Sequence, residues 1–209
     1  MLRFLLADDH SVVRQGVKQI LTGAFTQAVF GEAKNAQELL KLVGKETWDI
    51  VVLDLNMPGG NGLEALKQIK HTHPQLPVLI LSMYPEDQYA VRTIIAGAAG
   101  YLNKESAPEE LVKAVKTLLR GGEYISGSVA DELVLHARHE DDQPLHKHLS
   151  DREFQVLCLI ASGKEVKEIS NELSLSAKTI STYRARLLIK MNMDTNAELT
   201  NYAIKNSLV

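Results

Sequence analysis

The chain has 209 residues, of which 45% are hydrophobic and 23% charged, a composition typical of ordinary globular proteins and not of disordered or membrane proteins. This length predicts one large domain or two small ones. A formal net charge of -3 excludes a protein whose whole surface attracts nucleic acid, so any DNA binding has to come from a local basic patch.

The apolar stretch at the N-terminus is interrupted by Asp8 and Asp9 too early for a signal peptide, and no later apolar run reaches the ~18 residues of a membrane span. We therefore expect a cytoplasmic protein that has no contact with membranes. The single cysteine, Cys158, lies in an apolar run, which predicts a buried small hydrophobic residue and excludes an internal disulfide.

Short β-rich runs alternate with amphipathic helical patterns over the first 120 residues. The strands are expected at residues 3–7, 28–32, 50–53, 78–81 and 100–102. This alternation predicts βα units on a parallel sheet. The runs 50–53 and 78–81 are continuously apolar, which indicates strands covered by helices on both faces. We predict a doubly wound α/β domain, a fold whose ligands bind at the carboxyl ends of the strands.

Beyond residue 121 the pattern changes, and the segment 137–148 is polar, charged and interrupted by Pro144. These features are typical of a linker. We expect a first domain over residues 1–121, a partly helical linker over 122–147 and a second domain over 148–209.

The second domain has the pattern of a small all-α domain with four short helices. Ser150 followed by Glu153 predicts a capping box at the start of the first helix. Ser176 is placed to cap a longer helix that begins near Ala177, and a last helix is expected over about 195–206.

Acidic residues follow two of the predicted strands: Asp8 and Asp9 come after the first and Asp54 after the third. Because parallel strands end at one edge of a sheet, these acids should converge, and a hard divalent cation such as Mg²⁺ would relieve their repulsion. Two further strand ends supply Ser82 and Lys104. The set suits phosphoryl transfer onto a carboxylate, with Asp54 as the nucleophile.

The residues of this pocket carry a resemblance to a known family. The motifs Asp8-Asp9-His10, residues 54–62, Ser82 and residues 100–104 resemble the receiver domain of response regulators, over about residues 1–121. The resemblance implies a flavodoxin-like, doubly wound receiver with five parallel strands. It also implies that a sensor histidine kinase phosphorylates this domain.

The resemblance further assigns the phosphate and its metal to individual residues. Asp54 is the expected phosphoacceptor, with Mg²⁺ as the cofactor. Asp9 and Asp54 would bind the ion directly, Asp8 would contribute through water, and the backbone carbonyl of Asn56 would complete the protein ligands.

The remaining pocket residues receive roles in catalysis and switching. Ser82 would hydrogen-bond the phosphoryl group and Lys104 would pair with its charge. Tyr101 would be the aromatic switch that turns inward as Ser82 moves. Asn56 and Tyr84 lie two residues beyond Asp54 and Ser82, so we expect them to face the pocket and to tune the rate of phosphate loss.

The longer helix of the second domain has one apolar and one basic face. Its residues Ile180, Leu187 and Met191 are spaced for the core. Between residues 178 and 190 there are four basic residues and no acid, which is the local positive patch that DNA binding requires. Small polar residues on this face leave room to approach base edges, and the flanking arginines and lysines suit phosphates.

The segments 149–157, 168–170 and 175–187 closely resemble the LuxR-type helix-turn-helix. Together with the receiver they make the chain similar to the NarL/FixJ family, and residues 178–184 are similar to its BvgA/EvgA-like members. The resemblance places Ser181, Thr182 and Ala185 at the bases, and Lys178, Thr179, Arg184 and Arg186 nearer the DNA backbone.

Regulators of this kind bind DNA as dimers on inverted repeats. The resemblance places the dimer contact on the last helix, at Leu199, Tyr202, Ala203 and Asn206. The alternative for these four residues is ordinary packing on the domain core.

The main hypothesis is therefore a phosphorylation-switched transcription regulator. Its expected partners are a sensor histidine kinase, promoter DNA and, when it is active, a second copy of the chain, with RNA polymerase as a further candidate. We expect no enzymatic activity beyond self-phosphorylation from phosphodonors and self-dephosphorylation at Asp54. An aspartyl phosphatase is disfavoured because Asn56 stands where such enzymes need an acid. A receiver that works without phosphate is the third alternative.

Overall fold

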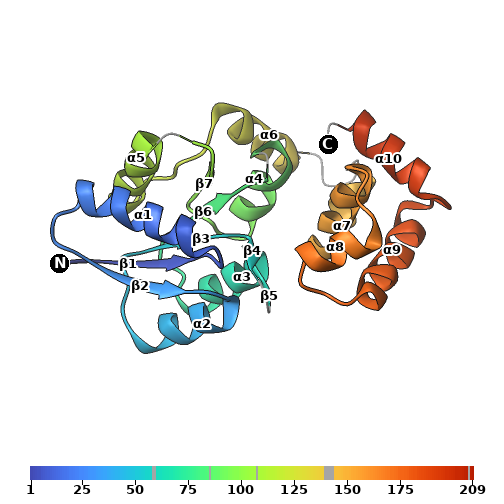
Figure 1. Ribbon diagram of the computed structural model, residues 1–209. Helices are drawn as coiled ribbons and strands as arrows, with labels where there is room; N and C mark the ends of the chain where they lie inside the picture. The colour runs from blue at the N-terminus through green and yellow to red at the C-terminus, as the bar shows by residue number, and fades with distance from the viewer. Residues whose placement is uncertain (58–59, 85, 107, 139–143, 207) are drawn as a thin grey trace. The chain divides into compact units, whose positions relative to one another are not determined.

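The computed structural model describes residues 1–57, 60–84, 86–106, 108–138, 144–206 and 208–209 (Figure 1). Part of the predicted linker, residues 139–143, and two residues of the 54–62 motif lie outside this range. The chain divides into two compact units, Met1–Leu133 and Val134–Val209.

The first unit is built on a five-stranded parallel sheet with the strand order β2-β1-β3-β6-β7. The strands are β1 (Leu2–Ala7), β2 (Ala28–Ala33), β3 (Ile50–Leu53), β6 (Val78–Ser82) and β7 (Gly100–Asn103). A short antiparallel pair, β4 (Asn56–Met57) and β5 (Gly60–Asn61), stands apart from this sheet. The predicted fold class is confirmed.

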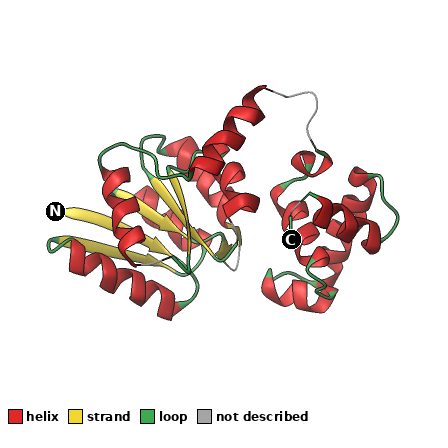
Figure 2. Cartoon of the chain, turned by 90° about the horizontal axis from the view of Figure 1, so that it is seen from above, coloured by secondary structure: helices red, strands yellow, loops and turns green. Residues whose placement is uncertain are grey.

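Helices connect the strands and cover both faces of the sheet (Figures 1 and 2). Helix α1 packs with α5 on one face, and α2 packs with α3 on the other. The helices of this unit are α1 (Ser11–Ala24), α2 (Ala36–Lys45), α3 (Gly62–Thr72), α4 (Glu86–Ile95) and α5 (Pro108–Leu119). Helix α6 (Gly127–Arg138) contains the boundary between the two units.

The core of this unit lies in the sheet, where the two continuously apolar runs form β3 and β6 with every residue buried. Phe4 on β1 is fully buried and stacks on Phe30 of β2 at a ring distance of 5.2 Å. It also contacts Phe25, at 5.3 Å. Truncating such a core aromatic typically costs about 3 to 5 kcal/mol of stability.

The sheet hydrogen bonds continue one residue past the strands, which aligns the residues of the pocket. Asp8 N–H donates to the carbonyl of Ala33, and Asp54 N–H donates to the carbonyl of Ala7 at 2.8 Å. Lys104 N–H donates in the same way to the carbonyl of Ser82. The residue after each strand is therefore fixed relative to its neighbour, and this brings the predicted site residues to one edge.

The second unit contains helices α7 (Asp151–Ala161), α8 (Val166–Glu172), α9 (Ala177–Met191) and α10 (Asn196–Lys205). Its core includes Leu157, Ile169, Ile180, Leu187 and Leu199, all fully buried. Cys158 is buried too, as predicted. None of the helices in the described part of the chain has the length and apolar character that a membrane span requires.

Two helices of the second unit, α7 and α9, begin at the capping residues that the sequence indicates. Ser150 and Glu153 form the predicted capping box, and the Ser176 side chain accepts a hydrogen bond from Thr179 N–H. A second capping box, between Thr195 and Glu198, begins α10. Each cap satisfies backbone N–H groups that would otherwise lack a partner.

The stretch expected as a linker contains more structure than its composition indicates. Helix α6 runs to Arg138, and a 3-10 turn, η1 (Leu145–His148), follows Pro144. His146 in this turn is only 6% exposed, and its Nδ1 lies 3.0 Å from Tyr202 Oη on α10. A four-residue turn has no helical periodicity, so the sequence pattern gives no sign of it.

Candidate functional site

Lys104 joins two of the acids in the pocket. Its Nζ lies 2.7 Å from Asp8 Oδ2 and 2.7 Å from Asp54 Oδ2. The carboxyl groups of Asp8 and Asp54 and the Lys104 side chain are each at most 8% exposed. Asp8 follows β1, Asp54 follows β3 and Lys104 follows β7, so residues distant in sequence meet at one edge of the sheet, as the sequence predicts.

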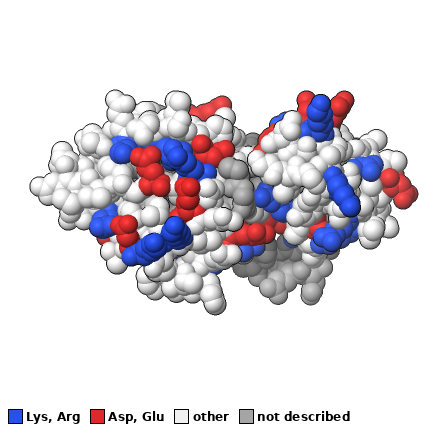
Figure 3. Space-filling model, turned by 60° about the horizontal axis from the view of Figure 1, so that its bottom comes forward, with Lys and Arg blue, Asp and Glu red and all other residues white. Residues whose placement is uncertain are grey.

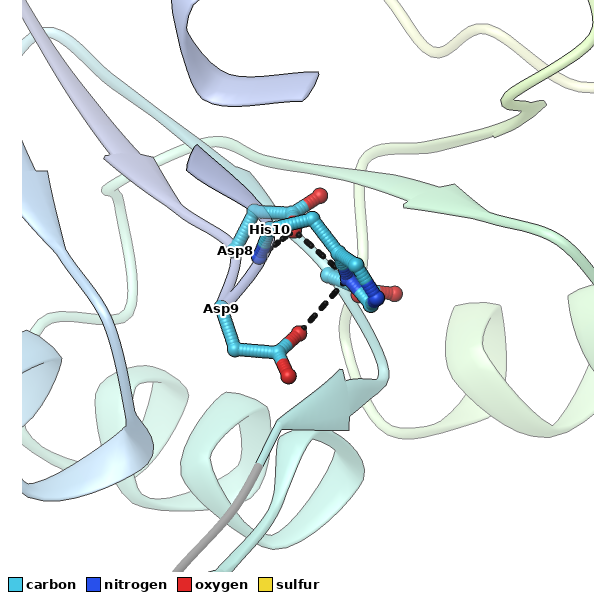
Figure 4. Close-up of side chains that lie close together, drawn as sticks. Asp8, Asp9 and His10 are labelled. Carbon is cyan, nitrogen blue, oxygen red and sulfur yellow. Dashed lines mark hydrogen bonds and ion pairs between the residues drawn. The ribbon is translucent and has the colours of Figure 1, made fainter. Parts of the chain in front are cut away.

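Asp9 and His10 lie beside Asp8 in the same turn (Figure 4), with side chains that are 31% and 65% exposed. Together with Asp8 and Asp54 they offer ligand atoms that all lie within 4.8 Å of one another. Carboxylate oxygens are the ligands that Mg²⁺ prefers. The three carboxylates of this cluster therefore fit a hard divalent cation.

Burial dominates the electrostatics of Asp54. Loss of solvent raises the pKa of its carboxyl group to about 6, against an ordinary value of 3.8. The charge and hydrogen bond of Lys104 act in the opposite direction, and the nearby Asp8 carboxylate adds to the rise. Burial would lower the pKa of Lys104, but attraction to Asp54 and Asp8 outweighs it and the pKa is raised. Lys104 therefore stays charged.

A chain of hydrogen bonds runs from the pocket to β7. Ser82 is 1% exposed, and its Oγ accepts a hydrogen bond from Tyr84 N–H at 3.2 Å. The Tyr84 hydroxyl donates to Asn56 Oδ1 at 3.1 Å, while Tyr101 donates its hydroxyl to the Tyr84 carbonyl at 2.7 Å. Tyr101 points inward and is 2% exposed; this burial raises its pKa.

A glycine lets helix α3 begin directly against the residue after β3. A Cβ atom on Gly62 would lie 2.5 Å from the carbonyl oxygen of Asp54 and 2.6 Å from Leu55 Cα, so a larger residue would displace the backbone. The preceding Asn61 caps the helix by accepting a hydrogen bond from Leu63 N–H at 3.0 Å. The segment after Asp54 is thereby held tightly.

Sequence reasoning overlooked Arg14, which supports the pocket from α1. Arg14 is 5% exposed; it donates from Nη1 to the Asp8 carbonyl at 2.6 Å and from Nε to Glu32 at 3.3 Å. The missed signal is its spacing, because Arg14, Val17 and Leu21 share the buried face of α1. An arginine on a buried helix face indicates a specific partner.

On α9 the apolar stripe is buried and the opposite face is open. Ile180, Leu187 and Met191 are at most 1% exposed. The exposed members of the predicted DNA-binding set are Lys178, Ser181, Thr182, Ala185 and Arg186, and Thr179 and Arg184 are half-buried. Figure 3 shows several Lys and Arg side chains on one face of this unit.

Two basic residues of the predicted positive patch have partners within the unit. Arg184 Nε donates to Asn196 Oδ1 at 2.6 Å. Lys190 Nζ donates to Glu153 at 2.7 Å, and the Glu153 carboxyl is 4% exposed. The pair with Glu153 offsets part of the Lys190 charge within the unit.

The residues proposed for dimerisation divide into two groups. Leu199 and Ala203 are fully buried, on a helix that packs against α7, which corrects their placement in a dimer contact in favour of the core-packing alternative. Tyr202 is half-buried and bonded to His146, and Asn206 is exposed. Of these four residues, only Tyr202 and Asn206 have side chains that reach the surface.

Both units match known families. Residues 4–116 match the family described as "Response regulator receiver domain", and residues 147–203 match "Bacterial regulatory proteins, luxR family". The chain therefore belongs to the response regulators of the NarL/FixJ family. It is a two-component response regulator with a LuxR-type DNA-binding domain.

Similar proteins cover the whole chain. The response regulator UvrY of Escherichia coli (strain K12) is 36% identical over 209 residues, which span 100% of this chain and 96% of UvrY. GacA of Pseudomonas aeruginosa is 35% identical over 211 residues, spanning 100% of this chain and 98% of GacA.

Solved structures of one regulator resemble both units. One is a structure of RcsB from Salmonella enterica serovar Typhimurium bound to promoter rprA in the presence of phosphomimetic BeF3-. It is 27% identical to this chain with a TM-score of 0.63, and the match covers 97% of this chain and 98% of the RcsB chain. A structure of two RcsB dimers bound to two parallel DNAs is 28% identical with a TM-score of 0.59, over 96% and 97% of the two chains.

Proposed function

We propose that a sensor histidine kinase phosphorylates this regulator on Asp54 and that the phosphate controls promoter binding by α9. The observation that carries the proposal is the Lys104 ammonium group, placed 2.7 Å from the carboxylates of both Asp8 and Asp54. A cation held beside a buried carboxylate is ready to neutralise an incoming phosphoryl group.

In the proposed reaction an oxygen of Asp54 attacks the phosphorus atom of a phosphohistidine. The O–P bond forms, the N–P bond breaks, and the leaving imidazole takes up a proton. Lys104 then moves its contact from the two carboxylates to the phosphoryl oxygens, and Ser82 donates its hydroxyl to one of them. Self-phosphorylation from small phosphodonors follows the same route, with the donor's own oxygen or nitrogen leaving. In self-dephosphorylation a water molecule attacks the phosphorus atom instead, the bond between Asp54 and phosphorus breaks, and inorganic phosphate leaves.

Mg²⁺ is the proposed cofactor, held by Asp9, Asp54 and the backbone carbonyl of Asn56, with Asp8 contributing through water. When bound, the ion supplies positive charge at the phosphoryl oxygens. The carboxylate cluster supports this assignment. Asn56 also argues against a phosphatase, because its side chain has no acidic proton to give as a general acid. Its Oδ1 accepts a hydrogen bond from the Tyr84 hydroxyl instead.

We expect the conformational change in the receiver to involve Tyr84 and Tyr101, which are hydrogen-bonded to each other. Phosphorylation draws the Ser82 hydroxyl toward Asp54, which weakens its contact with Tyr84 N–H and so alters the site that Tyr101 occupies. Couplings of this kind are usually about 1 to 3 kcal/mol, so we expect tens-fold changes in DNA affinity.

For the second unit we propose base contacts from Ser181, Thr182 and Ala185, and backbone contacts from Lys178, Thr179, Arg184 and Arg186. Their exposure on α9 supports this. Binding would occur as a homodimer, in line with the RcsB dimers on DNA, and RNA polymerase is a further candidate partner.

Three finer proposals concern the chain as a whole. The domain limits are residues 1–121 and 148–209 with a linker over 122–147. The recognition segment 178–184 follows the BvgA/EvgA-like pattern, although the relatives matched over the whole chain are UvrY and GacA. The protein acts in the cytoplasm, away from membranes.

The test uses acetyl phosphate with Mg²⁺. Labelling of wild type is followed on gels that retard phosphoprotein, and DNA affinity is measured on promoter fragments selected with the protein itself. We expect labelling and a tens-fold gain in affinity, both absent from Asp54→Asn and unchanged in the exposed control Asp131→Asn. Unaltered DNA affinity after proven labelling of Asp54 would refute the switch.

A further inference from the structure

A histidine stands in the turn that carries the two acids, and the proposed function gives it no role. His10 Nδ1 lies 2.9 Å from Asp9 Oδ1 and 3.4 Å from Asp8 Oδ1 (Figure 4). With Asp54 these residues form the cluster whose ligand atoms lie within 4.8 Å of one another. The cluster therefore contains one nitrogen donor among carboxylate oxygens.

The position of His10 in the fold does not explain the choice of a histidine. It is the residue before α1, where Ser, Thr, Asp or Asn would normally cap the helix. The His10 side chain makes no capping bond. It is 65% exposed and lies beside the carboxylates instead, so the helix does not need the imidazole.

The turn itself is held firmly by its neighbours. Arg14 Nη1 donates to the Asp8 carbonyl at 2.6 Å, and His10 N–H donates to Asp8 Oδ1 at 2.7 Å. The other oxygen of that carboxylate pairs with Lys104. Because Asp8 is fixed at three points, the imidazole that follows two residues later is kept at the mouth of the pocket.

We propose that His10 is a nitrogen ligand that gives this pocket a selective affinity for borderline transition ions, such as Zn²⁺ and Co²⁺, in addition to Mg²⁺. The inference rests on the proposed metal site. Mg²⁺ prefers oxygen ligands and keeps several of its waters, whereas Co²⁺ and Zn²⁺ bind imidazole well. An ion held through His10 and Asp9 competes with Mg²⁺ for the same carboxylates.

Co²⁺ is the probe for this proposal, because its visible absorption reports its ligands. The full-length protein is titrated at about pH 8, because metal ligands bind in their deprotonated forms. Only Co²⁺ that excess Mg²⁺ displaces is counted, since other histidines of the chain also bind Co²⁺. Mg²⁺ affinity is measured separately by calorimetry. Asp9→Asn should abolish the displaceable signal.

We expect His10→Asn to lower the affinity for Co²⁺ by about tenfold or more, the scale on which ligand-shell changes act, and to leave the Mg²⁺ affinity unchanged. Asn is a preferred capping residue, so α1 should form normally. His71→Asn, at the exposed end of α3, is the matched control and should behave as wild type.

The outcomes separate this inference from the proposed function. An equal ratio of Co²⁺ to Mg²⁺ affinity in wild type and His10→Asn would refute the nitrogen ligand and leave the Mg²⁺ site standing. Failure of wild type to bind Mg²⁺ at all would refute the proposed metal site itself. If His10→Asn does not fold, His10→Ser, which also caps a helix, takes its place under the same criteria.

Discussion

Replacing Asp54 by Asn should stabilise the metal-free receiver at neutral pH. Burial raises the pKa of Asp54 to about 6 in the folded protein, against an ordinary value of 3.8, so its ionisation opposes folding. The folded state binds this proton more tightly than the unfolded chain. The stability of wild type therefore falls as pH rises from about 4 to about 6 and then levels off.

The size of the effect follows from these two values. Their difference corresponds to a free energy of about 3 kcal/mol, fully present above about pH 6. Asp54→Asn removes the ionisation and should be more stable than wild type by up to this amount at pH 8. Below about pH 4 the difference should vanish, because both side chains are then neutral.

The chain contains its own probe for this measurement. Trp48 is its single tryptophan and lies in the first unit, with the Arg3 guanidinium 5.0 Å from the centre of its ring and its Nε1–H donating to the Leu42 carbonyl. Urea unfolding followed by tryptophan fluorescence therefore reports the receiver alone. Chelator keeps the protein free of metal.

The control and the metal dependence decide the interpretation. Asp131→Asn, which removes an exposed acid from the same unit, should show no comparable pH dependence. Mg²⁺ should stabilise wild type by about 2.7 kcal/mol at a hundred times its dissociation constant, and Asp54→Asn by less. Equal stability of wild type and Asp54→Asn at pH 8, with no change between pH 4 and 7, would show that burial of Asp54 does not control its ionisation.

Three further predictions concern the second unit. Lys178→Ala should weaken binding at all DNA sites and reduce the salt slope by about one unit in anisotropy titrations, whereas Thr182→Val should change the preferred sequence; the reverse pattern contradicts the assignment. Glu153→Gln removes the ionic hydrogen bond to Lys190 and should therefore lower the free energy of unfolding by about 2 kcal/mol, as measured by thermal unfolding. An unchanged melting curve would show that this bond has no structural role. Burial acts to raise the pKa of Glu153, but hydrogen bonds from Lys190 and Ser150 outweigh it and hold the pKa below its ordinary value, so this stability should be lost at acid pH. Tyr202→Phe should lower stability by about 1 kcal/mol and leave DNA-bound dimers intact in sedimentation; loss of the dimer alone would place the hydroxyl in the interface.

Local patterns made the framework of this protein predictable. The runs at 50–53 and 78–81 became β3 and β6 because an apolar stretch of that length can be buried only between two helical layers. The meeting of Asp8 and Asp54 followed from strand direction alone. The capping box at Ser150 is also purely local, and the structure confirms it.

Contacts between distant elements were not predictable in the same way. Glu153 and Lys190 are 37 residues apart, and nothing near either of them indicates the other. The two-residue strands β4 and β5 are too short for a periodic pattern. The spacing of Arg14 could have indicated a buried position, but its partner at Asp8 could not be predicted, because a backbone carbonyl has no signature in the sequence.

The strand order has a consequence for how quickly each unit forms. In the sheet Phe4 pairs with Phe30 on one side and with Ile50 on the other, so completing the sheet around β1 requires a strand almost fifty residues further along the chain. Contacts of such wide sequence separation slow folding, whereas locally capped helices fold fast. The helical unit should thus reach its native state well before the parallel sheet when both refold together from denaturant, although during synthesis the sheet leaves the ribosome first.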